Sequence, residues 1–302
     1  MLRAMTRRTF FAGSTCALAL GKAAPSLAIT MDDVNWQQFP DPAKVNSGLI
    51  ATMREHGTHL ALFVIGRNAE GDQGRSLVRE WRVAGHVIGN HTYSHRSYDA
   101  MPFEQFSADV AKAGVLLEPE MGKQRLFRFP MLKEGNTPEK RDAMREYLAA
   151  HGYRNGHVTI DASDWYFDIR LRQRLAAEPN FDVTRFRQPY IDHLWARAQY
   201  YNQLAVDLLG RSAPHTLLIH YNLLNSLFLS DALAFFKKRG WRLVDAAEAY
   251  QDPLFTKMPD IVPAGESLLW ALAKQTGKFE KRLRYPGESD EYEKAGLDRL
   301  GL

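Results

Sequence analysis

The chain has 302 residues, of which 45% are hydrophobic, so it can bury a full core in one large domain or in two ordinary ones. Its formal net charge of +4 is the excess of 39 lysines and arginines over 35 acidic residues. The first 28 residues hold four cations and no acidic residue, which accounts for that whole excess: Arg3, Arg7, Arg8 and Lys22. The remainder is close to neutral, which argues against a nucleic-acid partner because no basic field remains to attract phosphates.

The N-terminal segment, residues 1–28, has the order of an export signal. A basic start is followed by an apolar and small stretch from Phe10 to Leu20 and then by further small residues. Within it, "TRRTFF" resembles a twin-arginine signal, although no single cleavage position stands out. The apolar run is too short and too interrupted for a stable membrane span, so we expect export to the periplasm or the medium. The only cysteine, Cys16, lies in this segment, so the mature chain would have no disulfide or cysteine nucleophile.

Short apolar runs rich in β-branched residues alternate with amphipathic stretches of helical length along the rest of the chain. The runs that predict strands are residues 26–30, 60–65, 86–89, 125–129, 157–160, 216–220 and 241–244. Several helical stretches end in glycine just before the next strand, as helix C-caps do. A strand followed by a helix, repeated seven times, predicts a parallel sheet that is closed or nearly closed into a (β/α) barrel.

Ionisable side chains stand at, or just after, the carboxyl ends of five of these predicted strands. In chain order they are Asp32 and Asp33, His91 and His95, Arg128, Asp161 and Asp164, and His220. The catalytic groups of parallel barrels lie at the C-terminal ends of the strands, so we expect these groups to meet in one site. Each has an ordinary structural explanation, such as a helix cap or a turn, but that explanation would have to apply five times.

The other histidines lack such positions. Three stand at the starts of strands, the end opposite to catalysis, and we expect structural roles for them: His86, His157 and His215. Four have no motif context and are expected at the surface: His56, His59, His151 and His193.

Two histidines four residues apart, joined by a carboxylate from another strand, form a usual ligand set for a catalytic Zn²⁺ with an open position. Adjacent aspartates on a turn can point in different directions. One of Asp32 and Asp33 could therefore bind the ion, while the other takes a proton from water whose pKa the ion has lowered.

A second proton must reach the leaving group. His220 is the natural general acid because imidazole titrates close to physiological pH. Either Asp164 or Asp161 could orient it and favour its protonated form, and Arg128 could hold the base carboxylate ionised by charge pairing. Together these groups predict metal-assisted hydrolysis through a tetrahedral intermediate.

Five ordered motifs within residues 25–255 resemble those of the polysaccharide deacetylases of carbohydrate esterase family four, the NodB-homology group. "ITMDDVNW" is similar to the first motif, which implies Asp32 as the catalytic base and Asp33 as a metal ligand. "GHVIGNHTYSH" is similar to the second, which implies His91 and His95 as the remaining protein ligands. The family fold is a distorted seven-stranded (β/α) barrel, in agreement with the strand pattern.

The later motifs concern the substrate as well as the chemistry. "FRFPMLKEG" resembles the third, which implies that Arg128 holds the base and that Pro130 shapes the groove. Met131 stands where the family usually has tyrosine, and the resemblance implies that its backbone N–H serves the oxyanion hole. "DASDWYF" resembles the fourth motif, so Trp165 would line the pocket and Asp164 would tune the general acid.

The fifth motif and the departures from the family pattern complete the resemblance. "LLIH" implies Leu218 beside the acetyl methyl group and His220 as the general acid. Val34 replaces a glycine after the two aspartates, so we expect that turn to avoid a glycine-only conformation. Residues 167–214 form a helical insertion between the fifth and sixth strands, expected to pack on the barrel and to border the groove, and residues 256–302 form a C-terminal extension outside the resemblance.

The sequence therefore predicts one barrel domain over residues 29–302 that removes acetyl groups from an acetylated oligo- or polysaccharide. An N-acetyl group is the first expectation, and one divalent ion, expected to be Zn²⁺, is the implied cofactor. Two alternatives stay open: a related barrel hydrolase acting on a non-sugar amide, and a catalytically silent glycan-binding protein. The sugar, its chain length, the choice between N- and O-deacetylation, the metal used in the cell and the oligomeric state do not follow from the sequence.

Overall fold

The computed structural model describes residues 24–285 and 288–302. Most of the expected export signal therefore lies outside the described residues, and its last three residues, 26–28, belong to the first strand. No helix in the described ranges combines the length and the apolar character needed to cross a membrane.

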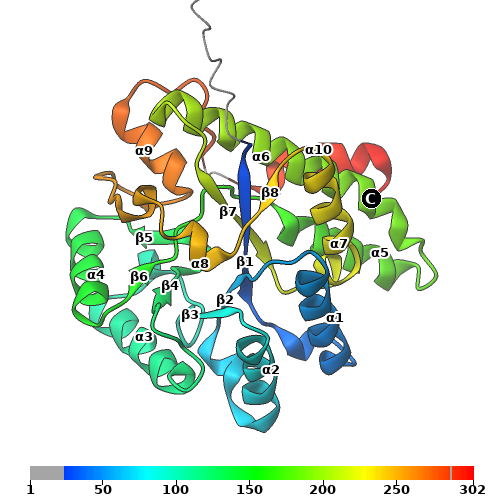
Figure 1. Ribbon diagram of the computed structural model, residues 1–302, viewed down its shortest axis with the longest axis horizontal. Coiled ribbons are helices and arrows are strands. Elements are labelled where there is room, and N and C mark those ends of the chain that lie inside the picture. The colour runs from blue at the N-terminus through cyan, green and yellow to red at the C-terminus, as the bar shows by residue number, and fades with distance from the viewer. Residues whose placement is uncertain (1–23, 286–287) are drawn as a thin grey trace, which may run out of the picture.

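A seven-stranded, parallel sheet forms the centre of the molecule, in the order β6-β4-β3-β2-β1-β7, with β8 also paired to β1. Figure 1 shows β1 in the middle, with β7 beside it and β2 and β3 following on the other side. The strands are β1 (Ser26–Asp33), β2 (Ala61–Val64), β3 (Val87–Asn90), β4 (Leu126–Phe127), β6 (Arg154–Asn155), β7 (Pro214–His220) and β8 (Arg242–Leu243). The predicted parallel, barrel-like α/β fold is confirmed, as a sheet curled into a half-barrel.

The expected fifth strand, residues 157–160, is wrong in detail. The residues that pair with β4 come earlier, in β6, and the end of the expected strand makes a single parallel bridge from Ile160 to Leu217 of β7. Between them, the carbonyl groups of Gly156 and His157 accept hydrogen bonds from side chains, Arg128 and Thr216 respectively, in place of a strand ladder. The segment 154–160 thus spans the gap between the two edges of the half-barrel.

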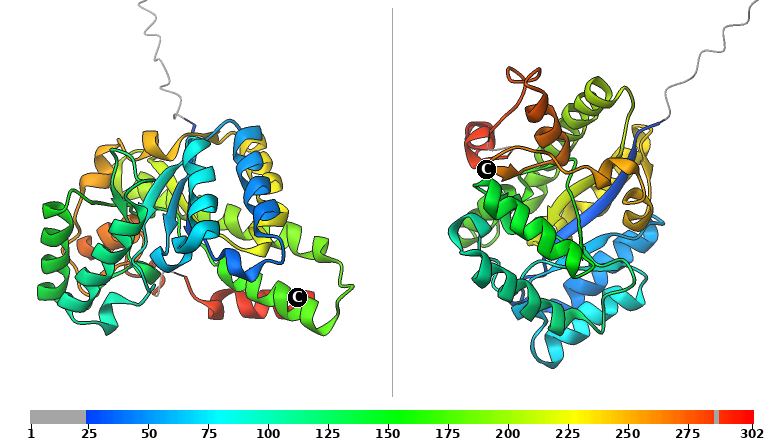
Figure 2. Two further views of the ribbon diagram at one scale, coloured as in Figure 1. Left: turned by 90° about the horizontal axis from the view of Figure 1, so that it is seen from below. Right: turned by 90° about the vertical axis from the view of Figure 1, so that its left-hand side faces the viewer.

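Helices follow the strands around the outside of the sheet, as Figures 1 and 2 show. Those of the barrel are α1 (Pro42–Glu55), α2 (Gly71–Val83), α3 (Phe103–Leu117), α4 (Pro138–Ala150), α7 (Leu223–Lys238) and the short α8 (Ala246–Ala249). Local sequence fixes several helix starts: Asp41, followed by Pro42 in the first turn, caps α1, and Asn222 caps α7.

Two further parts pack on this barrel. The expected insertion, 167–214, contains the long α6 (Arg187–Leu209) and most of α5 (Asp164–Ala177), which begins three residues before it. The extension contains α9 (Leu268–Thr276) and α10 (Asp290–Leu300). A small antiparallel pair, β5 (Lys133–Gly135) with β9 (Ala264–Gly265), ties the extension to the loop after β4. Sequence pattern did not predict this second sheet.

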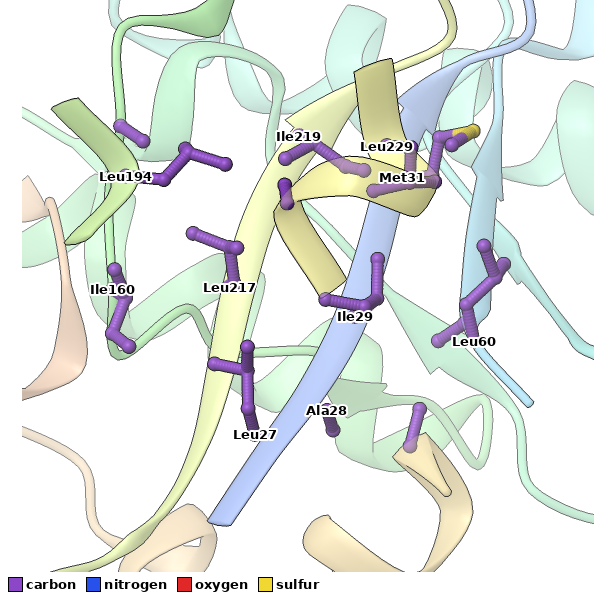
Figure 3. Packing of buried hydrophobic residues seen from close by; sticks show 14 of the residues in the cluster. Leu27, Ala28, Ile29, Met31, Leu60, Ile160, Leu194, Leu217, Ile219 and Leu229 are labelled. Carbon is purple, nitrogen blue, oxygen red and sulfur yellow. The ribbon is translucent and has the colours of Figure 1, made fainter. Parts of the chain in front are cut away.

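The two faces of β1 have different surroundings. Side chains alternate across a strand, and Leu27, Ile29 and Met31 belong to the main apolar core with Leu217 and Ile219 of β7 (Figure 3). On the opposite face Thr30 and Asp32 point into the barrel, where both bond to Arg128. The strand that anchors the core therefore also delivers a carboxylate to its interior.

Candidate active site

A pocket of about 360 Å³ lies at the carboxyl ends of the parallel strands. Strand ends supply four ionisable groups to its wall: Asp32, His91, His95 and His220. The rest of the wall consists of Met131, Leu132, Lys133, Asp161, Trp165, Leu218, Glu266 and Glu288. The side chains that five separate motifs place at strand ends are thus brought together, as the strand pattern predicts.

Asp33, His91 and His95 converge on one point. Their ligand atoms all lie within 4.8 Å of one another, with Asp33 Oδ1 3.6 Å from His91 Nε2 and 3.3 Å from His95 Nε2. Among the described residues Asp33 Oδ1 is buried with no hydrogen-bond partner. His91 Nδ1 donates to the carbonyl of Arg128 at 2.9 Å, so Nε2 carries the free lone pair that faces Asp33.

This group fits a divalent cation. Burial lowers the pKa of His91 well below 6.5 and also lowers that of His95, so both rings are neutral and able to act as ligands. One carboxylate and two imidazoles would leave one position of a tetrahedral ion open, as catalytic zinc sites do. Burying Asp33 Oδ1 without a hydrogen-bond partner costs free energy, and a bound cation would offset that cost.

Asp32 is held from behind by Arg128. Arg128 Nη1 donates to Asp32 Oδ1 at 2.7 Å, and the guanidinium is only 1% exposed. Its other donors bond to the carbonyl of Gly156, to Thr30 and to Tyr250, and its Cζ atom lies 3.9 Å from the centroid of the Phe63 ring. Burial raises the pKa of Asp32 to about 6 although Arg128 lowers it, so this carboxyl titrates close to neutrality.

His220 and Asp164 form a partly buried pair at the end of β7, beside Asp32 of β1. His220 Nδ1 lies 2.7 Å from Asp164 Oδ1, and the backbone N–H of His220 donates to Asp164 Oδ2 at 2.8 Å. Asn222 and Asn225 also donate to that oxygen. Burial alone would lower the pKa of His220, but the ion pair with Asp164 outweighs it and raises the value to about 10. Of the two carboxylates left open by sequence, Asp164 is the one that contacts His220.

Asp161, the alternative, lies elsewhere in the pocket wall. Burial, together with the nearby Glu288 and Glu266, raises the pKa of Asp161 well above 3.8, which favours its neutral form.

The residues assigned to substrate binding have different positions. Trp165, Leu218 and Met131 line the pocket, and Met131 is 54% exposed. Pro130 is buried and begins the short turn that presents Met131. Their contacts with substrate stay predictions.

Left-handed backbone conformations gather around this pocket. Within residues 24–285 and 288–302, the non-glycine residues with positive φ are Asp33, Val34, Thr92, His95, Met131, Leu132 and Glu266. The expectation that Val34 would avoid a glycine-type conformation is wrong, because its φ is 53°. Its side chain is fully buried in the core, which offsets backbone strain of about 1–3 kcal/mol.

Sequence reasoning missed part of the pocket wall. Glu266 and Glu288 come from the extension, and Lys133 Nζ lies 2.6 Å from Glu266 Oε1. The polar stretch around Glu288 has the composition of a surface segment, so no local signal marks it. His193, expected at the surface, is instead 6% exposed and accepts a hydrogen bond from the backbone of Ser163. His193 also belongs to a second group of possible metal ligands, with Glu288 and Glu293. In that group His193 Nε2 already accepts the hydrogen bond from Ser163.

Comparisons with known proteins point to one family. Residues 21–156 match the family model described as polysaccharide deacetylase. The chain is 24% identical over 149 residues to a peptidoglycan-N-acetylglucosamine deacetylase of Bacillus cereus, covering 49% of this chain and 50% of that protein. It is 33% identical over 119 residues to a chitooligosaccharide deacetylase of Azorhizobium caulinodans, covering 37% and 53%. The chain thus spans about half the length of these curated relatives.

Solved structures show a similar fold. The peptidoglycan deacetylase PdaC from Bacillus subtilis has a TM-score of 0.51 at 16% identity, covering 86% of this chain and 96% of that one. A pseudoenzyme of the CE4 family from Bacillus anthracis has a TM-score of 0.51 at 15% identity, covering 75% and 66%. The same fold therefore occurs in a protein described as a deacetylase and in one described as a pseudoenzyme, so the side chains of the site must carry any argument about activity.

Proposed function

Because residues 21–156 belong to the polysaccharide deacetylase family, we propose that the protein is a metal-dependent hydrolase that removes acetyl groups from an acetylated sugar. The observation that carries this proposal is the meeting of three units in one pocket: Asp33 with His91 and His95, Asp32 on Arg128, and His220 on Asp164. Each unit has a separate task in amide hydrolysis.

The metal would be held by Asp33, His91 and His95, and we propose Zn²⁺ because imidazole and carboxylate suit it. Bound there, such an ion supplies Lewis acidity, which polarises an acetyl carbonyl and lowers the pKa of water.

Asp32 is proposed as the general base. Arg128 fixes the Oδ1 oxygen of this carboxylate, which leaves Oδ2 toward the ligand group, 3.5 Å from His91 Nε2. A carboxylate in that position is able to take a proton from an attacking water as the carbonyl carbon becomes tetrahedral.

His220 is proposed as the general acid. Asp164 accepts from Nδ1 and fixes the ring, so Nε2 is the nitrogen left to give a proton to the departing amine. The raised pKa of His220 means that the ring carries this proton throughout the neutral range. A poor leaving group such as an amine needs that proton, whereas the base alone is sufficient for attack.

An acetylated amino sugar is the proposed substrate. The relatives are named for peptidoglycan N-acetylglucosamine and for chitooligosaccharide, and a pocket of about 360 Å³ with Trp165 in its wall suits a sugar ring. Aromatic faces pack well against the apolar faces of such rings. With the twin-arginine-like segment, we propose that the protein acts on this substrate outside the cytoplasm.

Acetate release from a panel of acetylated glycans tests the proposal. Purified protein is assayed on N-acetylated and O-acetylated oligosaccharides, with and without chelator, and the metal content is measured in parallel. We expect release from an N-acetylated sugar, loss of release on chelation, and recovery with Zn²⁺. Activity that survives complete metal removal would contradict the proposal. Release only from a non-sugar amide, or glycan binding without release, would favour one of the two alternatives.

A further inference from the structure

Ser163, the residue before Asp164, makes hydrogen bonds to α6 and to the C-terminal extension. Both lie outside residues 21–156, which match the family model. The backbone N–H of Ser163 donates to His193 Nε2 of α6 at 2.9 Å. Its hydroxyl donates to Glu288 Oε2 of the extension at 2.7 Å. Ser163 itself is fully buried, so each of these bonds replaces water that the residue cannot reach.

The two partners are themselves fixed. His193 Nδ1 lies 3.3 Å from Glu293 Oε1, and the ring packs on Phe167 with centroids 5.0 Å apart. Glu288 Oε1 lies 3.4 Å from Arg197 Nη1 of α6, and the Glu288 side chain is 3% exposed. Hydrogen bonds and ion pairs thus connect the insertion, the extension and Ser163 to one another.

The orientation of the Ser163 hydroxyl is informative. Ser163 occupies the N-cap position of α5, where a serine usually bonds to the backbone of its own helix. Here it makes no such capping bond and its hydroxyl bonds to Glu288 instead. The local helix gains nothing from this arrangement, whereas Ser163, which directly precedes Asp164, becomes fixed at both its backbone N–H and its side chain.

We propose that Ser163, His193 and Glu288 are positioning residues for the general acid, acting on His220 through Asp164. This inference rests on the proposed function. Asp164 bonds to His220 at both the ring and the backbone, so a shift of the start of α5, which carries Asp164, moves the imidazole relative to the leaving group. The insertion and the extension would thereby help to orient the general acid.

Paired variants on two substrates test the proposal with the Zn²⁺-loaded protein. His193→Phe keeps an aromatic ring but loses the acceptor, whereas His193→Gln keeps an acceptor. Glu288→Ala and Glu288→Gln form a second pair. Glu291→Ala changes an exposed residue of α10 and is the control. The substrates are an N-acetylated oligosaccharide, whose amine must be protonated to leave, and 4-nitrophenyl acetate, whose leaving group departs as an anion.

We expect kcat for the amide to fall about tenfold in His193→Phe and Glu288→Ala, a part of the 10²–10⁴-fold that general acid catalysis supplies. KM for the amide and hydrolysis of the ester should stay within about twofold, because attack does not need the acid. The Gln variants should recover most of the amide activity. Equal losses on both substrates, or no loss on either, would overturn the proposal.

The pKa of His220, measured by NMR of labelled imidazole, gives a readout independent of turnover. The two disruptive variants should lower that pKa because the Asp164 contact loosens, and Glu291→Ala should leave it unchanged. An unchanged pKa in all variants would reject the positioning role. A wild-type protein that releases no acetate would refute the proposed function instead, and this titration would still decide the inference.

Discussion

Asp32 and Asp33 are neighbours in sequence with different surroundings. Arg128 binds the first, whereas the second has a buried oxygen without a hydrogen-bond partner among the described residues and faces two imidazoles. The same substitution should therefore have different effects at the two positions.

We expect Asp32→Asn to reduce acetate release by at least about 100-fold, the lower end of a general base contribution, while about one Zn²⁺ per chain is retained. Asp33→Asn should lose the ion because an amide is a weaker ligand than a carboxylate. Acetate release and metal content measured on both proteins check this. Full activity of Asp32→Asn would contradict Asp32 as the base. Full metal content of Asp33→Asn would contradict Asp33 as a ligand.

A second prediction at this scale concerns pH. Asp164 raises the pKa of His220 to about 10, so the acid keeps its proton, and activity should persist, until the pH rises through that value. Asp164→Asn removes the ion pair, so the pKa of His220 should fall and the alkaline limb of the kcat profile should move to lower pH. An alkaline limb at the same pH in both proteins would mean that another group controls it.

At the scale of the element, segment 154–160 is the least regular part of the sheet and contacts Arg128 directly. A Cβ added at Gly156 would lie 2.2 Å from the ring of Phe63, which packs under the Arg128 guanidinium. Gly156→Ala should thus lower the free energy of unfolding by about 1–3 kcal/mol through overpacking and should also reduce activity, because Arg128 moves.

Gly48→Ala is the matched control for that change. Gly48 lies within α1 and has no atom within 4 Å of its added Cβ, so alanine should raise the free energy of unfolding by about 0.5–1 kcal/mol. Urea denaturation of both variants measures the two shifts. A Gly156→Ala protein as stable as wild type would show that the Phe63 ring moves freely.

The elements differ in how far sequence predicted them. The predicted strands 26–30 and 216–220 correspond to β1 and β7, because burial on both faces leaves a clear apolar pattern there. Residues 157–160 have the same pattern, but the Thr216 side chain occupies the carbonyl of His157, and Arg128 occupies that of the preceding Gly156. The pair β5 and β9 depends on a contact across about 130 residues that no local signal encodes.

At the scale of the whole molecule, two buried histidines at the starts of strands make the free energy of unfolding depend on pH. Burial lowers the pKa of His86 to about 4 and that of His215 to about 3. The unfolded chain binds these protons near 6.5, before the folded one, so the free energy of unfolding falls as the pH drops below that value. Each contributes a slope of up to about 1.4 kcal/mol per pH unit.

Urea denaturation between pH 7 and 5 measures this slope. His215→Gln removes one of the two groups, so its slope should be smaller than that of wild type even where the absolute stability differs. An identical slope in the two proteins would contradict a neutral, buried His215.

The pocket wall, like the pair β5 and β9, includes residues whose positions depend on contacts between distant parts of the chain. The groups at strand ends, such as Asp32, His91 and His220, were predictable because parallel strands bring their carboxyl ends to one edge. Glu266 and Glu288 were not, because their position depends on the path of the extension across the barrel. His193 was misjudged for a related reason, since its partner Ser163 is 30 residues away in sequence.

The left-handed residues around the pocket have a consequence for directed evolution. Asp33 and His95 are held at φ values of 84° and 57°, conformations that glycine adopts with less strain. Replacements of that kind would relax the backbone while they remove the groups that face a cation. A library selected for heat resistance alone should therefore accumulate inactive proteins at these positions, and selection would have to couple thermal challenge to turnover.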